Sequence, residues 1–540
     1  MTNDEHDFDV LIVGYGPVGA SLAALLGTLG HSVGVLEQYA KPYELPRAGH
    51  FDGEIMRAFQ AMGIAEEMEI LARPVFMYDL VDAEGARLHA ADIGRSGTGW
   101  KSDYCFYQPE LEATIAKRVE GLPSVTLHRN VRAIGIEQDT DGVRVTTVSG
   151  EDHSDGAGHI RTFSAKYLVG ADGNGGVVRS ALGLGYTDLG FTPLQYLVCD
   201  FENSDPDGNL LDFGEVRQHL DPARPALFGR WNGNRWSRWE FMVLPGDDPA
   251  ELEKPESVWE LVRPWGVSEA DGRFVRTKVY TFDAHVCEEP RAGRALIAGD
   301  AFHLMPPFMG QGMCSGIRDA VNLAWKLDLV LKGASDDILD SYRDERVDHV
   351  LAITHMSMEL AEICTITDPD AARLRNERYL RGEVEPETMP TLRAGLFATN
   401  SDGQVSAPAG TLAPQGRVYR AGRKALLDDH LEGGWQLVTR HPIDLGVLSP
   451  EHRLLVHQLG IQFAHVTPGV DNDDAFLDLD ATYGLWFRDN NCTIVLQRPD
   501  FYVFGTAADS NDLPRLLDQL AEKVGRFLDG SRTGERELTS

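Results

Sequence analysis

The chain has 540 residues, which is long enough for two or three domains with substantial hydrophobic cores. Its formal net charge of −33 argues against nucleic acid or an anionic membrane surface as the main partner. The sequence has an acidic start and no run of about 18 uninterrupted apolar residues, so neither a signal peptide nor a transmembrane helix is indicated. The six cysteines are scattered without a CxxC pair, which favours reduced thiols and no metal site. We therefore expect a cytoplasmic protein that binds neither nucleic acid nor membranes.

The first strongly patterned segment, residues 8–37, reads FDVLIVGYGPVGASLAALLGTLGHSVGVLE. A strand-like run leads into a turn that contains Gly14, Gly16 and Gly19, and a helical stretch and a second strand follow. The first glycine allows a tight turn, the second lets a pyrophosphate approach the backbone, and the third lets the helix pack closely. Glu37 ends the second strand, where an acid accepts hydrogen bonds from an adenosine ribose. The segment predicts a dinucleotide site.

Strand-like and helical runs alternate over residues 1–189, as in the first part of an α/β nucleotide-binding domain. Residues 190–286 are richer in aromatic and strand-like runs and predict a β-sheet substrate domain, with a hairpin that turns at residues 232–234. The nucleotide-binding pattern resumes over residues 287–400. This part contains two long helical stretches, and a polar stretch from residue 368 to residue 414 is interpreted as an irregular connector.

A separate C-terminal domain is predicted for residues 401–540. Strand-like runs occur at residues 484–487, 493–496 and 501–504, and an amphipathic helix follows near residues 513–528. Cys492 is the only cysteine of this part, so dithiol exchange is chemically excluded there.

Two further segments indicate an extended, flavin-bearing cofactor. In YLVGADGNGGVVRS, residues 167–180, a strand ends at Asp172 and Arg179 opens a helix. In RALIAGDAFHLMPPFMGQG, residues 294–312, a strand ends at Asp300 and a proline-bearing loop leads to a glycine-rich helix start. An acid at a strand end can hold ribityl or ribose hydroxyls. Backbone N–H groups at the helix start can stabilise a negatively charged flavin ring.

The GYGPVG, GADG and AGDAFHLMPPFMGQGMCSGIRDAVNLAWKL segments together resemble the single-component FAD-dependent aromatic hydroxylases of the para-hydroxybenzoate hydroxylase class. Within that class the chain resembles in particular the 3-(3-hydroxyphenyl)propionate hydroxylases and the related phenol and polyketide hydroxylases. The PRA, QP and LAPQ segments at residues 46–48, 108–109 and 412–415 fit the same pattern. The resemblance implies an α/β fold with a Rossmann-type FAD-binding domain, an inserted β-sheet substrate domain and a C-terminal thioredoxin-like domain.

The resemblance also implies which residues bind FAD. They are Gly14, Gly16, Pro17, Val18, Gly19, Glu37, Gln38, Arg47, Gln108, Val131, Asp172, Gly299, Asp300, Pro307, Gly310, Gln311, Gly312 and Met313. The chain departs from the family at two places, since Gly176 replaces a usual serine and Tyr15 replaces a commoner alanine. Neither change removes a backbone group that binds phosphate, but the first leaves the role of the turn between Asp172 and Arg179 open.

The implied activity is hydroxylation of a small phenolic substrate by dioxygen and NAD(P)H, ortho to an existing hydroxyl and through a flavin hydroperoxide. No second dinucleotide fingerprint is present, so the sequence does not decide between NADH and NADPH. A monomer and a homodimer both remain open. The alternatives are an FAD-dependent dehydrogenase or reductase without oxygen insertion, and a flavin-bearing sensor without turnover.

The candidate catalytic residues are His219 and Tyr196, which could help to deprotonate a phenol, and Pro307, which the resemblance places beside the flavin ring. Simple packing is the alternative for the first two. His303 could act as a base or serve as a packed side chain. The three arginines of the aromatic hairpin could bind a substrate carboxylate or lie on an exposed face. These are Arg230, Arg235 and Arg238.

Overall fold

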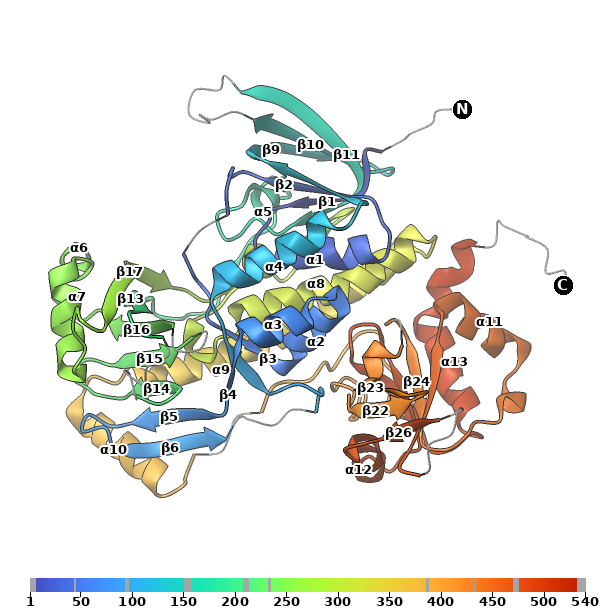
Figure 1. Ribbon diagram of the computed structural model, residues 1–540. Helices are drawn as coiled ribbons and strands as arrows, with labels where there is room; N and C mark the ends of the chain where they lie inside the picture. Colours follow the sequence, from blue (N-terminus) through green and yellow to red (C-terminus); the bar gives the residue numbers. More distant parts are fainter. Residues whose placement is uncertain are drawn as a thin grey trace.

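The structure, a computed structural model, describes residues 6–42, 45–92, 97–149, 158–206, 213–231, 235–384, 388–431, 433–469 and 475–531. A nucleotide-binding part, a second sheet and a C-terminal domain surround the central helix α8 (Gly312–Leu331), as Figure 1 shows. The chain visits these parts in an order that brings distant segments together, and the candidate site lies where the first two meet.

The nucleotide-binding part is built on a sheet with the strand order β19-β20-β11-β1-β2-β8. Strand β1 (Phe8–Val13) runs parallel to both of its neighbours, β2 (Val33–Glu37) and β11 (His159–Gly170). Residues 10–13 are buried because the sheet is covered on both faces, which explains their uninterrupted apolar run. Helix α1 (Pro17–Thr28) follows β1 and packs against α8. The predicted strand, glycine turn, helix and second strand are confirmed.

The second sheet has the order β17-β13-β16-β15-β14-β5-β6. Strands β15 (Ala226–Arg230) and β16 (Trp236–Met242) form the predicted antiparallel pair. The predicted turn between them, at residues 232–234, lies outside the described residues. The sheet is not a single insertion, because β5 (Met77–Val81) joins it in parallel to β14 (Val216–His219) and continues into β6 (Arg87–Asp92). The first part of the chain therefore supplies one edge of the substrate sheet.

The connector was expected to be irregular from residue 368, but it begins with helix α10 (Pro369–Leu380). Asp368 caps this helix, since its carboxylate accepts a hydrogen bond from the N–H of Ala371 at 2.8 Å. The helix packs on β6 and so covers the outer strand of the second sheet (Figure 1). Helix α10 is largely polar because much of its surface is exposed, so the sequence shows no clear helical hydrophobic pattern there.

The C-terminal domain has a thioredoxin-like core. Its strands β24 (Gln436–Thr439), β25 (Gln462–Thr467), β27 (Ile494–Gln497) and β28 (Val503–Ala507) lie in the order β28-β27-β24-β25. Strand β27 is antiparallel to β24 and β28, whereas β24 and β25 are parallel. Helix α13 (Leu513–Lys523) supplies the predicted amphipathic helix, followed by a short 3-10 segment.

The predicted strand at residues 484–487 is wrong, because this segment lies in helix α12 (Thr482–Asp489). The carboxylate of Asp478 accepts hydrogen bonds from the backbone N–H groups of Thr482, Tyr483 and Gly484 at 3.0–3.1 Å. These bonds satisfy the first orphan donors of the helix. A short apolar and aromatic run does not distinguish a strand from a helix without such a contact.

Replacement of Cys492 by serine should leave hydroxylation and its coupling to oxygen uptake unchanged. The thiol is buried beside β27, and burial raises its pKa to about 11, so it stays protonated and unreactive at neutral pH. Steady-state turnover and product yield of Cys492→Ser test this expectation. A large fall in hydroxylation, with normal folding and flavin content, would contradict a purely structural role for the domain.

Within the described ranges, no single helix is long and apolar enough to cross a membrane. The segments Asp336–Cys364 and Pro369–Leu380 meet the length and composition requirement only as a pair, and they are bent by 116° relative to each other.

Candidate cofactor and substrate site

A cavity of about 2400 Å³ runs from the glycine turn after β1 to the face of the second sheet. A pocket for one drug-sized ligand has a volume of roughly 300–1,000 Å³. The cavity therefore has room for a dinucleotide and a second, smaller molecule. Nearly all of the predicted cofactor residues line it; Gly19 and Gly299 lie just behind its wall.

The glycine turn is shaped for an anionic group. Gly14 has φ +101°, and a Cβ at this position would overlap the carbonyl of Ala171 and lie 2.9 Å from the Cα of Asp172. A Cβ at Gly16 would meet no protein atom within 4 Å, so the second glycine faces open cavity. Gly16 is also the N-cap of α1, which has no side-chain cap and no acid in its first turn. The N-terminus of this helix is thus open to the pyrophosphate of a dinucleotide.

The two glycines behind the wall hold the elements close together. A Cβ at Gly19 would overlap the carbonyl oxygen of Gly14, so only glycine lets α1 pack against the turn. Gly299 has φ +62°, and a Cβ there would come within 2.9 Å of the side chain of Val18. Both residues therefore act through packing.

Glu37 lies at the end of β2, lines the cavity and braces the glycine turn. Its carboxylate accepts hydrogen bonds from the N–H of Tyr15 at 2.9 Å and the N–H of Tyr39 at 2.8 Å. A carboxylate has further lone pairs, so a ribose hydroxyl can donate to it as well.

Glu37→Ala should weaken FAD binding by about 1–3 kcal/mol, because it removes a charge-assisted acceptor for the ribose and for the turn. Flavin titration of the apo-protein measures the change in affinity. Unchanged affinity and flavin occupancy would show that Glu37 does not contact the ribose.

The two departures from the family pattern have local explanations. A Cβ at Gly176 would overlap the carboxylate of Asp172, which accepts a hydrogen bond from the N–H of Val178 at 3.0 Å and caps the start of the next helix. The ring of Tyr15 lies 5.2 Å from the guanidinium of Arg129. Burial raises the pKa of Asp172, so a hydroxyl donor in the cavity would stabilise the charged form of this carboxyl group. The side chain of Arg179 stacks over Tyr186 rather than lining the cavity.

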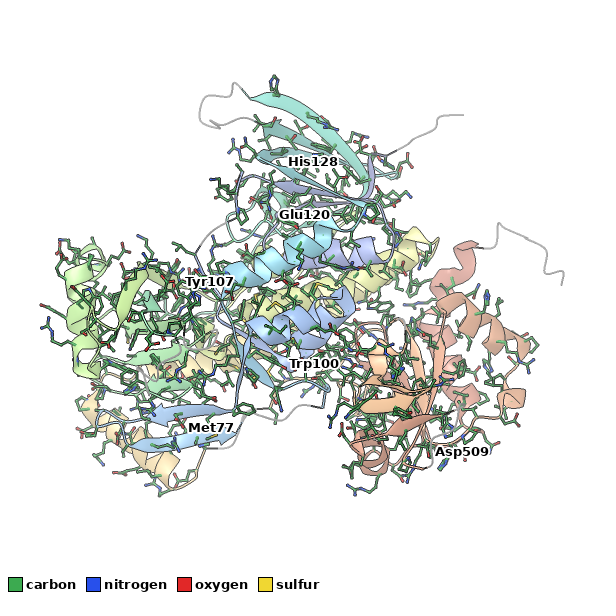
Figure 2. The ribbon with its side chains drawn as sticks, in the orientation of Figure 1. Met77, Trp100, Tyr107, Glu120, His128 and Asp509 are labelled. Atoms are coloured by element: carbon green, nitrogen blue, oxygen red, sulfur yellow. The ribbon has the colours of Figure 1, made fainter. Side chains whose placement is uncertain are left out.

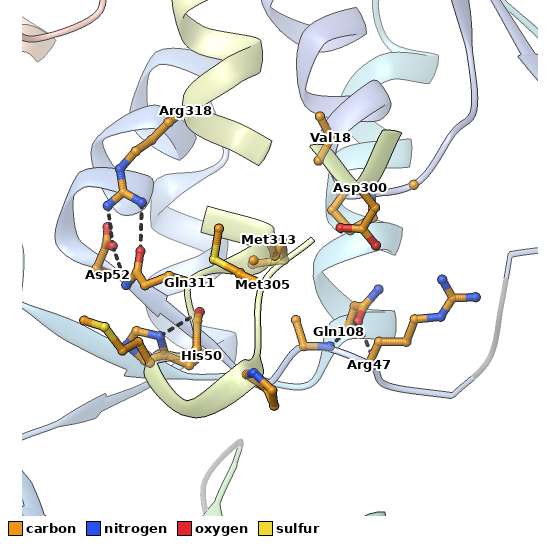
Figure 3. A pocket seen from close by; sticks show the side chains of 18 of the residues that line it. Val18, Arg47, His50, Asp52, Gln108, Asp300, Met305, Gln311, Met313 and Arg318 are labelled. Carbon is orange, nitrogen blue, oxygen red and sulfur yellow. Dashed lines mark hydrogen bonds and ion pairs between the residues drawn. The ribbon is translucent and has the colours of Figure 1, made fainter. Parts of the chain in front are cut away.

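Residues 46–48 are held along the cavity by Gln108, at the start of α4 (Gln108–Glu120). The side-chain oxygen of Gln108 accepts hydrogen bonds from the N–H of Arg47 at 2.8 Å and the N–H of Ala48 at 2.7 Å (Figure 3). Gln108 therefore fixes the backbone of the PRA segment, and Arg47 of this segment lines the cavity.

Asp300 follows strand β20 (Ala295–Ile297), and its carboxylate opens onto the cavity opposite Gln108 (Figure 3). The surrounding protein raises the pKa of this carboxyl group by desolvation. A hydroxyl of an extended cofactor that donates to it would relieve this cost. Behind Asp300, the buried carboxylate of Asp319 accepts a hydrogen bond from the N–H of Gly299 at 3.1 Å and holds the turn.

The loop at residues 307–313 is held by a charged cluster that sequence reasoning missed. The guanidinium of Arg318 donates to Gln311 at 2.8 Å and to Asp52 at 2.5 Å (Figure 3). It also donates to Glu54 at 2.6 Å. From the C-terminal domain, the hydroxyl of Tyr502 donates to Glu54 at 2.9 Å. These contacts fix the loop and the N-terminus of α8, whose first N–H groups have no acceptor within the helix. These N–H groups at the start of α8 would suit an electron-rich flavin ring.

The far end of the cavity is lined by aromatic and apolar side chains from the second sheet and the helices opposite. They include Tyr78, Val198, Leu227, Tyr280, Phe308 and Tyr379. The sheet is anchored to the cofactor side by an aromatic stack, since Tyr107, labelled in Figure 2, lies parallel to Trp236 with the ring centres 4.3 Å apart. The chamber is therefore suited to an aromatic molecule.

A polar cluster interrupts this aromatic wall. Arg238 and Arg276 lie on either side of Asp200 and contact its carboxylate at 2.7 and 2.6 Å. Arg238 also donates to the carbonyl of Arg47 at 2.9 Å, which ties the sheet to the cofactor segment. The carboxylate of Glu240 lies 3.5 Å from Arg238 and faces the chamber.

The structure does not bring Tyr196 or His219 to the cavity wall. Tyr196 is buried between Phe282 and Phe308, with ring centres 5.7 and 5.8 Å away. His219 packs against Trp265 on the opposite side of the sheet, and burial lowers its pKa to about 4. Neither position suits a base for a bound phenol. Pro307 does line the cavity.

The other sequence alternatives are resolved by packing. His303 is buried and hydrogen-bonded to Asp319 at 2.8 Å, so it is a packed residue. Strand pairing aligns Arg238 with Gly229, and it therefore sends Arg230 to the opposite face. Arg235 lies on the surface and pairs with Glu202 at 3.4 Å. For Arg238 the sequence left open an exposed face or a contact with a substrate carboxylate. The structure instead buries it in the polar cluster.

Comparison with known proteins identifies the family. Residues 7–357 match the FAD binding domain family, and residues 410–523 match the HcaD C-terminal domain. The chain is 37% identical to a probable NADH-specific resorcinol 4-hydroxylase of Rhodococcus jostii, over 96% of this chain and 95% of that protein. It is 32% identical to a 3-(3-hydroxy-phenyl)propionate/3-hydroxycinnamic acid hydroxylase of Comamonas testosteroni, over 86% and 82%.

The chain belongs to the FAD-dependent aromatic hydroxylases. Its fold matches the crystal structure of aklavinone-11 hydroxylase with a TM-score of 0.76 at 22% identity, over 96% of this chain and all of the other. A further flavin-dependent monooxygenase matches with a TM-score of 0.78 at 20% identity, over 97% and 100%. The predicted family and fold class are confirmed, and the enzyme is a flavin monooxygenase.

Proposed function

We propose that the enzyme hydroxylates a small phenol, ortho to an existing hydroxyl, with dioxygen and NADH. The predicted cofactor residues that line the cavity are proposed to bind FAD, and Gly19 and Gly299 are proposed to support them through packing. The relatives support the substrate class, because one is named for resorcinol and the other for hydroxylated phenylpropanoids. The name of the first relative also supports NADH as the reductant.

The observation that carries this proposal is the continuity of the cavity. One space joins the open glycine turn to the aromatic chamber, and the loop at residues 307–313 lies between the two. A dinucleotide with its phosphates at Gly16 and a hydroxylated chain at Asp300 would extend toward this loop. A phenol in the chamber would then lie within reach of the redox-active ring.

Bound FAD would accept a hydride from NADH and activate dioxygen. The protein's own part is binding, orientation and exclusion of water. Gln108 and the Arg318 cluster fix the segments on either side of the ring site, and the aromatic wall would help to exclude water once a substrate is bound. Pro307 and Phe308 are proposed to bound the ring side of the chamber.

A screen of phenols against the FAD-loaded enzyme tests the proposal. Resorcinols, hydroxyphenylpropionates and larger polycyclic phenols should be compared for NADH oxidation that is coupled to formation of a hydroxylated product. Coupled turnover with at least one phenol is expected. Hydroxylation of non-phenolic compounds alone would overturn the proposed substrate class.

A flavin dehydrogenase or reductase is the alternative to exclude. Such an enzyme would oxidise NADH without placing oxygen in a product, so it would give only hydrogen peroxide with every phenol. We further propose that the enzyme acts in the cytoplasm, since all six cysteines lie in the described part of the chain, are buried and form no disulfide bond. A monomer or a homodimer is proposed as the oligomeric state.

A further inference from the structure

The chamber wall presents a carboxylate to the substrate. Glu240 lies on β16 near the middle of the second sheet, and its side chain is 17% exposed, toward the cavity. Its nearest ionic partner is Arg238, at 3.5 Å, which is longer than a normal hydrogen bond. Burial raises the pKa of Glu240 above its ordinary value despite this neighbour. A buried carboxylate in such a position is stabilised by a hydrogen-bond donor from a ligand.

The two cations beside Glu240 already have an anionic partner. The guanidinium groups of Arg238 and Arg276 both pair with Asp200. Arg238 donates further to backbone carbonyls of the PRA segment, and Arg276 donates to the hydroxyl of Tyr280 at 3.0 Å. Two positive charges are thus matched by the two negative charges of Asp200 and Glu240. The cluster has no net charge to offer an anionic ligand.

Other basic side chains of the cavity lie elsewhere, as far as the described residues extend. Arg47 interacts electrostatically with Glu112 and Asp300 at the cofactor end, and His50 pairs with Asp103 at 2.8 Å beside the flavin loop. Arg129 stacks on Tyr15 beside the glycine turn, and Arg318 is paired with Asp52 and Glu54 at the flavin loop. His89 is on the edge strand β6, four strands away from Glu240 in the sheet order.

We infer that the Glu240 carboxylate accepts a hydrogen bond from a ring hydroxyl of the substrate and that the enzyme thereby selects uncharged phenols over phenols with a carboxylate side chain. This inference rests on the proposed function. A phenolic O–H is the donor that the acid requires, and a hydrogen bond to a charged acceptor is stronger than a neutral one. A substrate carboxylate would place a second anion beside Glu240 with no unmatched cation nearby. The substrate class is therefore a di- or polyhydric benzene of the resorcinol type.

Two ligands of matched shape test whether the wild-type enzyme prefers uncharged phenols to phenols with a carboxylate side chain. The acid 3-(3-hydroxyphenyl)propionate and its primary amide have nearly the same shape and differ in charge. Dissociation constants can be measured from the change in the flavin absorption spectrum of the holoenzyme. The amide should bind at least about tenfold more tightly than the acid, and resorcinol should also be preferred over the acid.

Glu240→Gln should weaken resorcinol binding about tenfold and reduce the preference for amide over acid, because the repelling charge is gone. Glu202→Gln is the matched control, since Glu202 lies on the neighbouring strand but pairs with Arg273 outside the cavity. It should leave all three affinities unchanged. Flavin content and melting temperature confirm that each variant is folded.

Tighter binding of the acid by the wild type, or unchanged affinities in Glu240→Gln, would overturn the inference. Hydroxylation of no phenol at all would instead overturn the proposed function. Coupled hydroxylation with a preference for the acid would overturn the inference alone.

Discussion

Gly16→Ala should weaken FAD binding by at least about tenfold while the free energy of unfolding of the apo-protein changes by less than about 0.5 kcal/mol. The backbone at Gly16 has φ −77° and ψ −177°, which alanine adopts without strain, and the added methyl group would meet no protein atom within 4 Å. The methyl group would instead occupy the space through which the pyrophosphate approaches the N-terminus of α1.

Gly14→Ala is the paired variant and should behave differently. Alanine at φ +101° is strained, and its methyl group would overlap the carbonyl of Ala171. We expect the apo-protein to lose about 3 kcal/mol of stability or more and to lose FAD binding with it. Denaturant titration of both apo-variants and flavin titration separate the two effects. Equal losses of stability in the two variants would contradict separate roles for the two glycines.

The second large effect concerns the contact between α8, α9 (Asp340–Cys364) and the C-terminal domain. The buried carboxylate of Glu345 contacts Lys326 at 2.8 Å and Arg498 at 2.7 Å, and Arg498 also pairs with Asp500. Arg498 belongs to the segment after β27, so the cluster joins the domains. Glu345→Gln removes one buried negative charge, and Asp500 then remains beside the two cations Lys326 and Arg498. The substitution should reduce the free energy of unfolding by about 3–5 kcal/mol.

Glu67→Gln makes the same chemical change in the exposed pair between Glu67 and Lys117, and it should shift the free energy by less than about 0.5 kcal/mol. The interactions with Arg498 and Lys326 hold the pKa of Glu345 below its ordinary value of 4.5, despite the opposing effect of burial. A carboxylate whose pKa is depressed by folding stabilises fully above its unfolded pKa and loses this contribution as the pH falls. The difference between wild type and Glu345→Gln should therefore shrink below pH 4.5. Equal effects of the two substitutions at neutral pH would contradict the account.

The dinucleotide fold could be predicted because its signals are local. Gly14, Gly16, Gly19 and Glu37 follow one another within one strand, turn, helix and strand, and each has a backbone requirement that few residues meet. The fold of the C-terminal domain depended on the family resemblance, and α12 was misread since its cap, Asp478, acts through hydrogen bonds that a hydrophobic pattern does not reveal.

The substrate chamber was harder to predict, because it is assembled from segments far apart in the chain. Strand β5 joins the sheet from the first part of the chain, and the cluster around Asp200 combines three strands. Strand alternation alone could have grouped Asp200 with Arg238 once their pairing was known, but the register was not available from the sequence. Tyr196 and His219 were selected by residue type, and their positions away from the cavity depend on tertiary packing.

The most direct test of the account is turnover with isotopically labelled dioxygen. The FAD-loaded enzyme should be supplied with NADH, labelled dioxygen and resorcinol, and the product analysed by mass spectrometry. We expect one labelled oxygen atom in the product, ortho to an existing hydroxyl, for each NADH oxidised and each dioxygen consumed. Unlabelled product, or hydrogen peroxide with no hydroxylated product from any phenol tested, would contradict it.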